Sequence, residues 1–172
     1  MTIRSKLMLA IAAMALGTTS VAAAPVSSTT PPAGRALLLI PLTLTKIDDL
    51  SFGSVIPSPV SGTIVINATT GLRTVLGGIT AVPSDVGHRA RFGGAGSPSQ
   101  QVLVIVTAPT SLTSAAGDTL TVLALTLEGA PVRSIHPVDR TFFFGVGGII
   151  QVAANQPEGV YSSNYDVTAN YL

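Results

Sequence analysis

The chain has 172 residues, of which 47% are hydrophobic and 10% charged, and its 9 basic and 8 acidic residues nearly balance. This aliphatic content excludes a disordered chain, and the charge balance provides no basic patch that would bind nucleic acid. The sequence contains no cysteine, which excludes disulfides, thiolate metal sites and cysteine nucleophiles. The length predicts one domain.

Residues 1–23 have the pattern of a signal peptide. Arg4 and Lys6 give a positive start, an apolar stretch covers residues 7–17, and small residues follow. That stretch of 11 residues is too short to cross a bilayer, so we expect cleavage after Ala23 or Ala24. An N-terminal helix or membrane anchor is the alternative. Cleavage leaves 7 basic against 8 acidic residues, a net charge near −1.

Residues 24–35 are small, polar and rich in proline, which predicts a flexible leader. A β domain is expected from residue 36 to residue 172. Its first part, residues 36–45, is rich in Leu and Thr but has Pro41 in the middle. Because proline has no amide hydrogen, this part is either an edge strand or a break between two strands.

Alternating and β-branched residues predict strands further along the chain, at 62–68, 101–108, 119–127, 141–154 and 160–171. Turn residues separate them, at 57–59, 70–71, 77–78, 93–96, 116–118 and 128–129. The glycines at 145–148 are interpreted as a bulge or bend within a strand. This pattern indicates an all-β fold, an antiparallel sandwich or barrel.

The last predicted strand alternates strictly, and it runs to the final residue. One face carries Tyr161, Ser163, Tyr165, Val167, Ala169 and Tyr171. The other face is polar, as expected for a strand that is covered by a core on one side.

Several short sequences resemble known exported proteins. Tyr171 is the penultimate residue and Gly159 is the fourteenth from the end, which is similar to the C-terminal signature of chaperone–usher pilins. The body resembles a bacterial exported family, domain of unknown function 4402, and is similar in plan to archaic pilins related to spore coat protein U. The matching pieces are 42–46 (LTLTK), 50–53 (LSFG), 77–79 (GGI), 90–92 (ARF), 146–148 (VGG) with 150–152 (IQV), and 155–161 (NQPEGVY).

This resemblance implies an immunoglobulin-like, pilin-type antiparallel β-sandwich that lacks its last strand. In pilins a periplasmic chaperone first supplies the missing strand, and the N-terminal segment of another subunit then replaces it. The missing strand leaves a groove with unpaired backbone groups. A contact of this head-to-tail kind does not close on itself and builds a fibre.

Residues 34–44 (GRALLLIPLTL) are the candidate donor strand. One face carries Ala36, Leu38, Ile40, Leu42 and Leu44. The alternative is that this stretch is the first strand of the domain itself, or that donor and first strand divide near Pro41. The acceptor side is expected to include Gly159, Tyr161, Tyr165, Val167, Ala169 and Tyr171.

Catalytic and metal-binding patterns are weak. His136, Asp139 and Ser134 lie close in sequence, but their spacing on a loop does not make a catalytic triad. Asp48 and Asp49 could join a calcium site, although a solvated turn explains them as well. We therefore expect no enzyme activity, no cofactor and no metal.

The sequence thus predicts a structural subunit of a bacterial surface fibre or coat. It would pass through the periplasm to the cell surface, with copies of itself, a periplasmic chaperone and an outer-membrane usher as partners. No nucleic-acid partner and no membrane span after signal removal are expected. The alternative is a self-contained β-sandwich at the cell surface or in the periplasm that binds a glycan or a protein.

Overall fold

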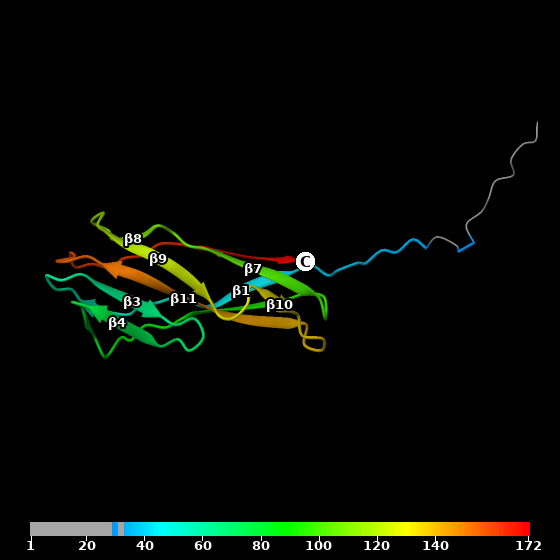
Figure 1. Ribbon diagram of the computed structural model, residues 1–172, viewed down its shortest axis with the longest axis horizontal. Helices are drawn as coiled ribbons and strands as arrows, with labels where there is room; N and C mark the ends of the chain where they lie inside the picture. The colour runs from blue at the N-terminus through cyan, green and yellow to red at the C-terminus, as the bar shows by residue number, and fades with distance from the viewer. Residues whose placement is uncertain (1–28, 31–32) are drawn as a thin grey trace, which may run out of the picture. The chain divides into compact units, whose positions relative to one another are not determined.

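The computed structural model describes residues 29–30 and 33–172. The predicted signal peptide and most of the predicted leader lie outside the described residues. The chain divides into two units, Met1–Leu37 and Leu38–Leu172. The described part of the first unit forms no helix or strand, and the second unit holds the strands (Figure 1).

The second unit is all-β and antiparallel, with no helix among its residues. Its strands are β1 (Thr43–Asp48), β2 (Val55–Ile56), β3 (Gly62–Ile66), β4 (Arg73–Gly77), β5 (Thr80–Ala81), β6 (Ala90–Ala95), β7 (Gln101–Thr107), β8 (Ser111–Thr113), β9 (Thr119–Leu127), β10 (Val132–Ser134), β11 (Thr141–Val152) and β12 (Asp166–Tyr171). The prediction of an antiparallel β-sandwich is confirmed.

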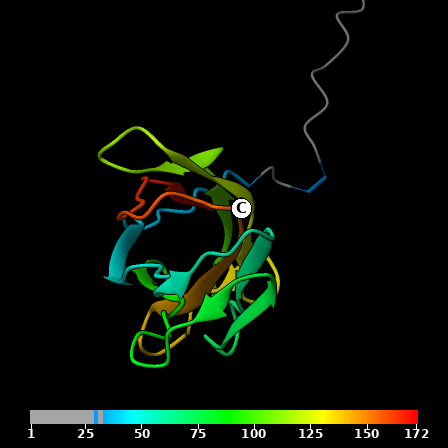
Figure 2. The ribbon, with the colours of Figure 1, turned by 90° about the vertical axis from the view of Figure 1, so that its left-hand side faces the viewer.

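The larger sheet has seven strands and is organised around β11. The first half of β11 pairs with β6, and the second half pairs with β3 and β9. β1 extends the sheet beyond β6, β4 extends it beyond β3, and β8 pairs with β9. The smaller sheet has the order β10-β7-β12, and β2 pairs with β5 alone. Figure 2 views these strands from one end of the unit.

Two hydrophobic clusters form the interior. The first lies between the two sheets and joins Phe92, Phe142 and Phe144 of the larger sheet to Val102 and Val104 of the smaller one. Its aromatic rings stack, with the centroids of Phe92 and Phe144 5.3 Å apart. The second cluster consists of Ile64, Ile79, Leu120, Ile150 and Val152. Each fully buried aliphatic side chain contributes about 1.5–3 kcal/mol to stability.

The strands predicted at 62–68, 101–108, 119–127 and 141–154 are confirmed as β3, β7, β9 and β11. The predicted turn at 93–96 is wrong, because Gly93, Gly94 and Ala95 belong to β6. A Cβ atom on Gly94 would lie 2.2 Å from Cζ of Phe142. Glycine is therefore present in this strand because an aromatic ring of the next strand covers it closely.

The strand predicted at 160–171 begins only at Asp166. Ser162 instead forms an isolated bridge with Thr113, at the end of β8 in the larger sheet. The chain must therefore cross from the larger sheet to the smaller one before β12 can start. Within β12 the predicted alternation is confirmed, since Val167, Ala169 and Tyr171 pack against the first cluster.

Candidate functional site

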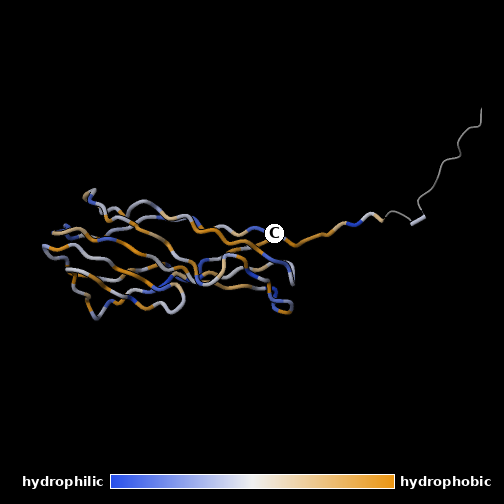
Figure 3. Tube along the Cα trace, viewed as in Figure 1, coloured by the Kyte–Doolittle hydropathy of each residue, from blue (hydrophilic) through white to orange (hydrophobic). Residues whose placement is uncertain are grey.

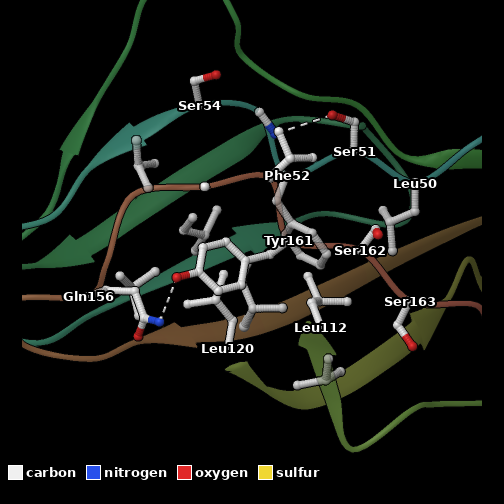
Figure 4. A pocket seen from close by; sticks show the side chains of 18 of the residues that line it. Leu50, Ser51, Phe52, Ser54, Leu112, Leu120, Gln156, Tyr161, Ser162 and Ser163 are labelled. Atoms are coloured by element: carbon white, nitrogen blue, oxygen red, sulfur yellow. Dashed lines mark hydrogen bonds between the residues drawn. The ribbon is translucent and has the colours of Figure 1, made fainter. Parts of the chain in front are cut away.

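The second unit contains a groove with a volume of about 550 Å³ (Figure 4). Two segments form its sides, which we call the first wall (residues 50–57) and the second wall (residues 156–165). Apolar side chains of the larger sheet form its floor. These are Ile64, Leu112, Leu120, Val122, Ile150 and Val152.

Arg73 of β4 holds the first wall in place. Its Nη1 donates hydrogen bonds to the carbonyl oxygens of Ser54 at 3.0 Å and Asp85 at 2.8 Å, and its Nη2 donates to the carbonyl oxygen of Val82 at 2.9 Å. Gly53 lies within this network with a φ of 68°. A Cβ atom there would lie 2.5 Å from the carbonyl oxygen of Asp85, so the LSFG sequence requires its glycine.

Gln156 organises the second wall. It is buried, and its Nε2 donates to the carbonyl oxygen of Thr119 at 3.1 Å and to the hydroxyl of Tyr161 at 3.0 Å. The Tyr161 hydroxyl in turn donates to the carbonyl oxygen of Pro157 at 2.7 Å. These bonds fix the Tyr161 ring over the floor residues Leu120 and Leu112 (Figure 4). Sequence reasoning missed Gln156 and Arg73, although Gln156 belongs to the NQPEGVY sequence.

Tyr165 lines the groove and has a hydroxyl without a hydrogen-bond partner among the described residues. Its ring packs edge-on against Phe92, with centroids 6.5 Å apart. The hydroxyl oxygen is buried. Burial raises the pKa of Tyr165 to about 12, with a smaller contribution from the charge of Asp49. A neutral, buried hydroxyl without a partner costs free energy in this state of the subunit.

Asp85 and Glu158 are the acidic residues of the groove lining. Ser54 Oγ donates to Oδ2 of Asp85 at 2.6 Å, and this hydrogen bond holds the pKa of Asp85 below its ordinary value. The Asp85 carboxylate is fully accessible to water. It therefore adds a negative charge at the rim without burying one inside.

Among the strands that pair on one side only in the described part of the chain, β1 and β12 share a hydrophobic cluster. β1 pairs only with β6, and β12 pairs only with β7. Side chains of both strands, among them Leu44 and Val167, pack against the same hydrophobic cluster. Two edges that share a core without a ladder between them leave backbone groups available for a further strand.

The structure divides the predicted donor residues into two groups. Ala36, Leu38 and Ile40 are exposed and lie outside any strand, with Leu38 86% exposed. Leu42 and Leu44 pack against the first cluster, and Leu44 belongs to β1. Figure 3 shows the apolar stretch before β1 in orange.

The structure also places the predicted acceptor residues. Gly159, Tyr161 and Tyr165 line the groove. Val167, Ala169 and Tyr171 belong to β12 and pack against the first cluster, away from the groove lining.

Other polar residues form ordinary surface pairs. Nδ1 of His136 lies 3.2 Å from Oδ2 of Asp139, and both side chains are exposed. Asp48 pairs with Arg91, and Asp49 pairs with Lys46. Among the described residues, no group of three or more His, Asp or Glu is placed to hold a metal ion. In the same part of the chain, no helix is long and apolar enough to span a membrane.

The groove walls coincide with the sequences that carry the family resemblance. A family model described as Domain of unknown function (DUF4402) matches residues 42–171. The chain belongs to this family. The DUF4402 match includes both walls, the floor and the whole of β1 and β12. No curated protein and no solved structure matches the chain.

Proposed function

We propose that this DUF4402 chain is a structural subunit of a bacterial surface fibre or coat that assembles head to tail by donor-strand complementation. In this proposal the sandwich is of the incomplete, pilin-like type. One observation carries it, namely that the same chain presents an apolar groove and an apolar segment without a partner. The segment of one copy would enter the groove of the next, between its first and second walls, and add a strand there.

The segment before β1, residues 33–39, is apolar and exposed and belongs to no sheet. None of the described residues 33–39 makes a hydrogen bond or ion pair. Leu37 is 72% exposed and Leu38 is 86% exposed. Burying each such leucine yields about 1.5–3 kcal/mol. Two or three buried leucines and a row of main-chain hydrogen bonds would hold adjacent subunits firmly.

The proposal also explains why helper proteins would be needed. Before assembly, a subunit with an open groove exposes apolar side chains and unpaired strand edges, which promote aggregation. A periplasmic chaperone would cover this groove, and an outer-membrane usher would exchange it for the next subunit. The subunit would thus pass through the periplasm and end in a fibre on the cell surface.

The test is a denaturing gel of material sheared from cells, run with and without boiling and probed for this chain. We expect a ladder that collapses to monomer on boiling, because dissociation must remove a whole buried strand and is slow. The double variant Leu37→Asp/Leu38→Asp should give monomer only. Val138→Asp, which alters an apolar residue 78% exposed in a loop, is the matched control and should keep the ladder.

A self-contained surface module that binds a glycan or protein in the same groove is the alternative function. Three aromatic rings favour it, since Phe52, Tyr161 and Tyr165 line the groove. Sugars stack on such rings. A single monomer band in both lanes, from folded and exported protein, would exclude the fibre and leave this alternative.

A further inference from the structure

The backbone of Ile40 is held by side chains of its own domain. Its amide donates a hydrogen bond to Ser97 Oγ at 2.8 Å, and its carbonyl oxygen accepts one from the Tyr171 hydroxyl at 2.9 Å. The Tyr171 hydroxyl also accepts a bond of 2.7 Å from the amide of Ser97. Three hydrogen bonds therefore join Ile40, Ser97 and Tyr171, an arrangement that we call the Ile40 clamp.

The clamp is a tightly built site. Ser97 is 7% exposed, although it is polar. A Cβ atom on Gly96 would lie 2.4 Å from the Tyr171 hydroxyl, so the absence of a side chain at Gly96 makes room for that hydroxyl. Because Ser97 is buried, its amide cannot easily find another partner if the bond to Tyr171 is lost, so that bond is costly to break.

The clamp and the groove lie at opposite ends of β12. Tyr165 lines the groove immediately before this strand, and Tyr171 is the last residue of the strand. A strand of this length separates them by about 20 Å, at about 3.3 Å per residue. β1 spans the same two places in the opposite direction, since Leu42 just before it lies beside the clamp at Gly96 and Leu50 just after it lines the groove.

We infer that Tyr171 and Ser97 act as positioning residues that fix Ile40 to its own domain and make Leu39 the last residue that can be donated to another copy. This inference rests on the proposed function. Both polar backbone groups of Ile40 are already satisfied, and Pro41 has no amide hydrogen. Ile40 therefore has no backbone hydrogen bond to offer a neighbour, whereas residues 33–39 do.

The position of the clamp also bears on which groove receives the donor segment, that of its own subunit or that of a second copy. The donor segment starts from the end of the sandwich that is remote from the groove of its own subunit. To fill that groove, the segment would have to turn back along the whole length of β12. The clamp therefore favours insertion into a second copy over self-insertion.

Hydrogen exchange of individual amides tests the clamp in the exported full-length chain. In the monomeric Leu37→Asp/Leu38→Asp background we expect the Ile40 amide to be protected. Adding Ser97→Ala, which removes its acceptor, should accelerate its exchange on the order of tenfold, the effect of losing about one hydrogen bond. Tyr171→Phe should also accelerate it. Tyr161→Phe is the matched control, because it removes a hydroxyl that bonds a different carbonyl, and it should leave Ile40 unchanged.

Hydrogen exchange of the assembled wild-type protein tests whether Leu39 is the last residue that is donated. Amides of residues 36–39 should gain protection on assembly, while Ile40 should be equally protected before and after. Tyr171→Phe should raise the monomer fraction on the unboiled gel, and it should also lower the urea midpoint of the monomer, because the amide of the buried Ser97 loses its acceptor. Protection of Ile40 that appears only on assembly, or that Ser97→Ala leaves unaltered, would overturn the inference. Absence of any polymer would instead overturn the proposed function, with Ile40 still protected in the monomer.

Discussion

At the scale of single residues, the groove depends on polar side chains that donate hydrogen bonds to backbone carbonyl oxygens. Arg73 donates to carbonyl oxygens of Phe52 and Ser54 in the first wall and of two residues in the loop beside it, Val82 and Asp85. Gln156 links β9 to the second wall. Tyr165 differs from both, because its buried hydroxyl has no partner among the described residues. This unsatisfied hydroxyl therefore lowers the stability of the folded subunit.

Replacing Tyr165 with Phe should leave the free energy of unfolding of the monomer unchanged at neutral pH, or raise it by up to about 1 kcal/mol. The variant loses no hydrogen bond, and it removes an unsatisfied buried hydroxyl. Urea unfolding at pH 7 measures this change. A clear loss of stability would show that the hydroxyl has a partner in solution.

The raised pKa of Tyr165 predicts a second difference in stability, between the wild type and the Tyr165→Phe variant at high pH. Its pKa is about 12 in the folded chain against an ordinary value of 10.0, so folding favours the neutral form. The resulting stabilisation is complete below pH 10 and is lost as the pH rises toward 12. Between these values wild type should therefore lose more stability than Tyr165→Phe. Parallel pH curves in urea unfolding would contradict the assigned burial.

At the scale of strands, glycines allow neighbouring strands to approach each other closely. β6 carries Gly93 and Gly94 beneath the rings of Phe143 and Phe142, and Gly147 of β11 lies close to the backbone of β3. A Cβ atom on Gly147 would lie 2.2 Å from the carbonyl oxygen of Ile66. The glycines of one strand therefore make room for the aromatic rings or the backbone of the strand beside it.

Gly94→Val should destabilise the domain by about 1–3 kcal/mol, because the new side chain must displace the Phe142 ring from the core. The midpoint of urea unfolding checks this effect. Gly34→Val is the matched control, since no atom lies within 4 Å of a Cβ at that position, and it should leave the midpoint unchanged. Equal midpoints for both variants would show that β6 can repack.

The same glycines explain what could be predicted from the sequence. Long alternating runs such as 101–108 and 119–127 predicted β7 and β9 correctly, because side-chain alternation is a local property. The glycine pair of β6 was mistaken for a turn, because only Phe142 on another strand reveals its role. The resemblance to pilins implied an acceptor groove with Tyr161 and Tyr165 among its residues, and both line the groove that the structure shows. Arg73 could not be assigned, since its partners are backbone carbonyl groups of loops, which carry no signal in the sequence.

At the scale of the whole molecule, the groove and the Ile40 clamp lie at opposite ends of β12. If the donor segment fills the groove as proposed, a peptide of residues 33–40 should bind the full-length Leu37→Asp/Leu38→Asp chain, whose own segment is disabled. At a peptide concentration 100 times Kd, the stabilisation should be about 2.7 kcal/mol, seen as a rise in Tm. The same peptide with Leu37 and Leu38 replaced by Asp should have no effect. Equal Tm values with both peptides would refute recognition of this segment.

The separation of the Ile40 clamp from the groove has a consequence for the length of any array that these contacts build. Subunits joined end to end in one direction always leave two unlike termini, one with an empty groove and one with a free segment. Growth then stops when free subunits are used up or when a cap occupies the growing terminus. If the contacts dissociate slowly, the ratio of caps to subunits would set the average length.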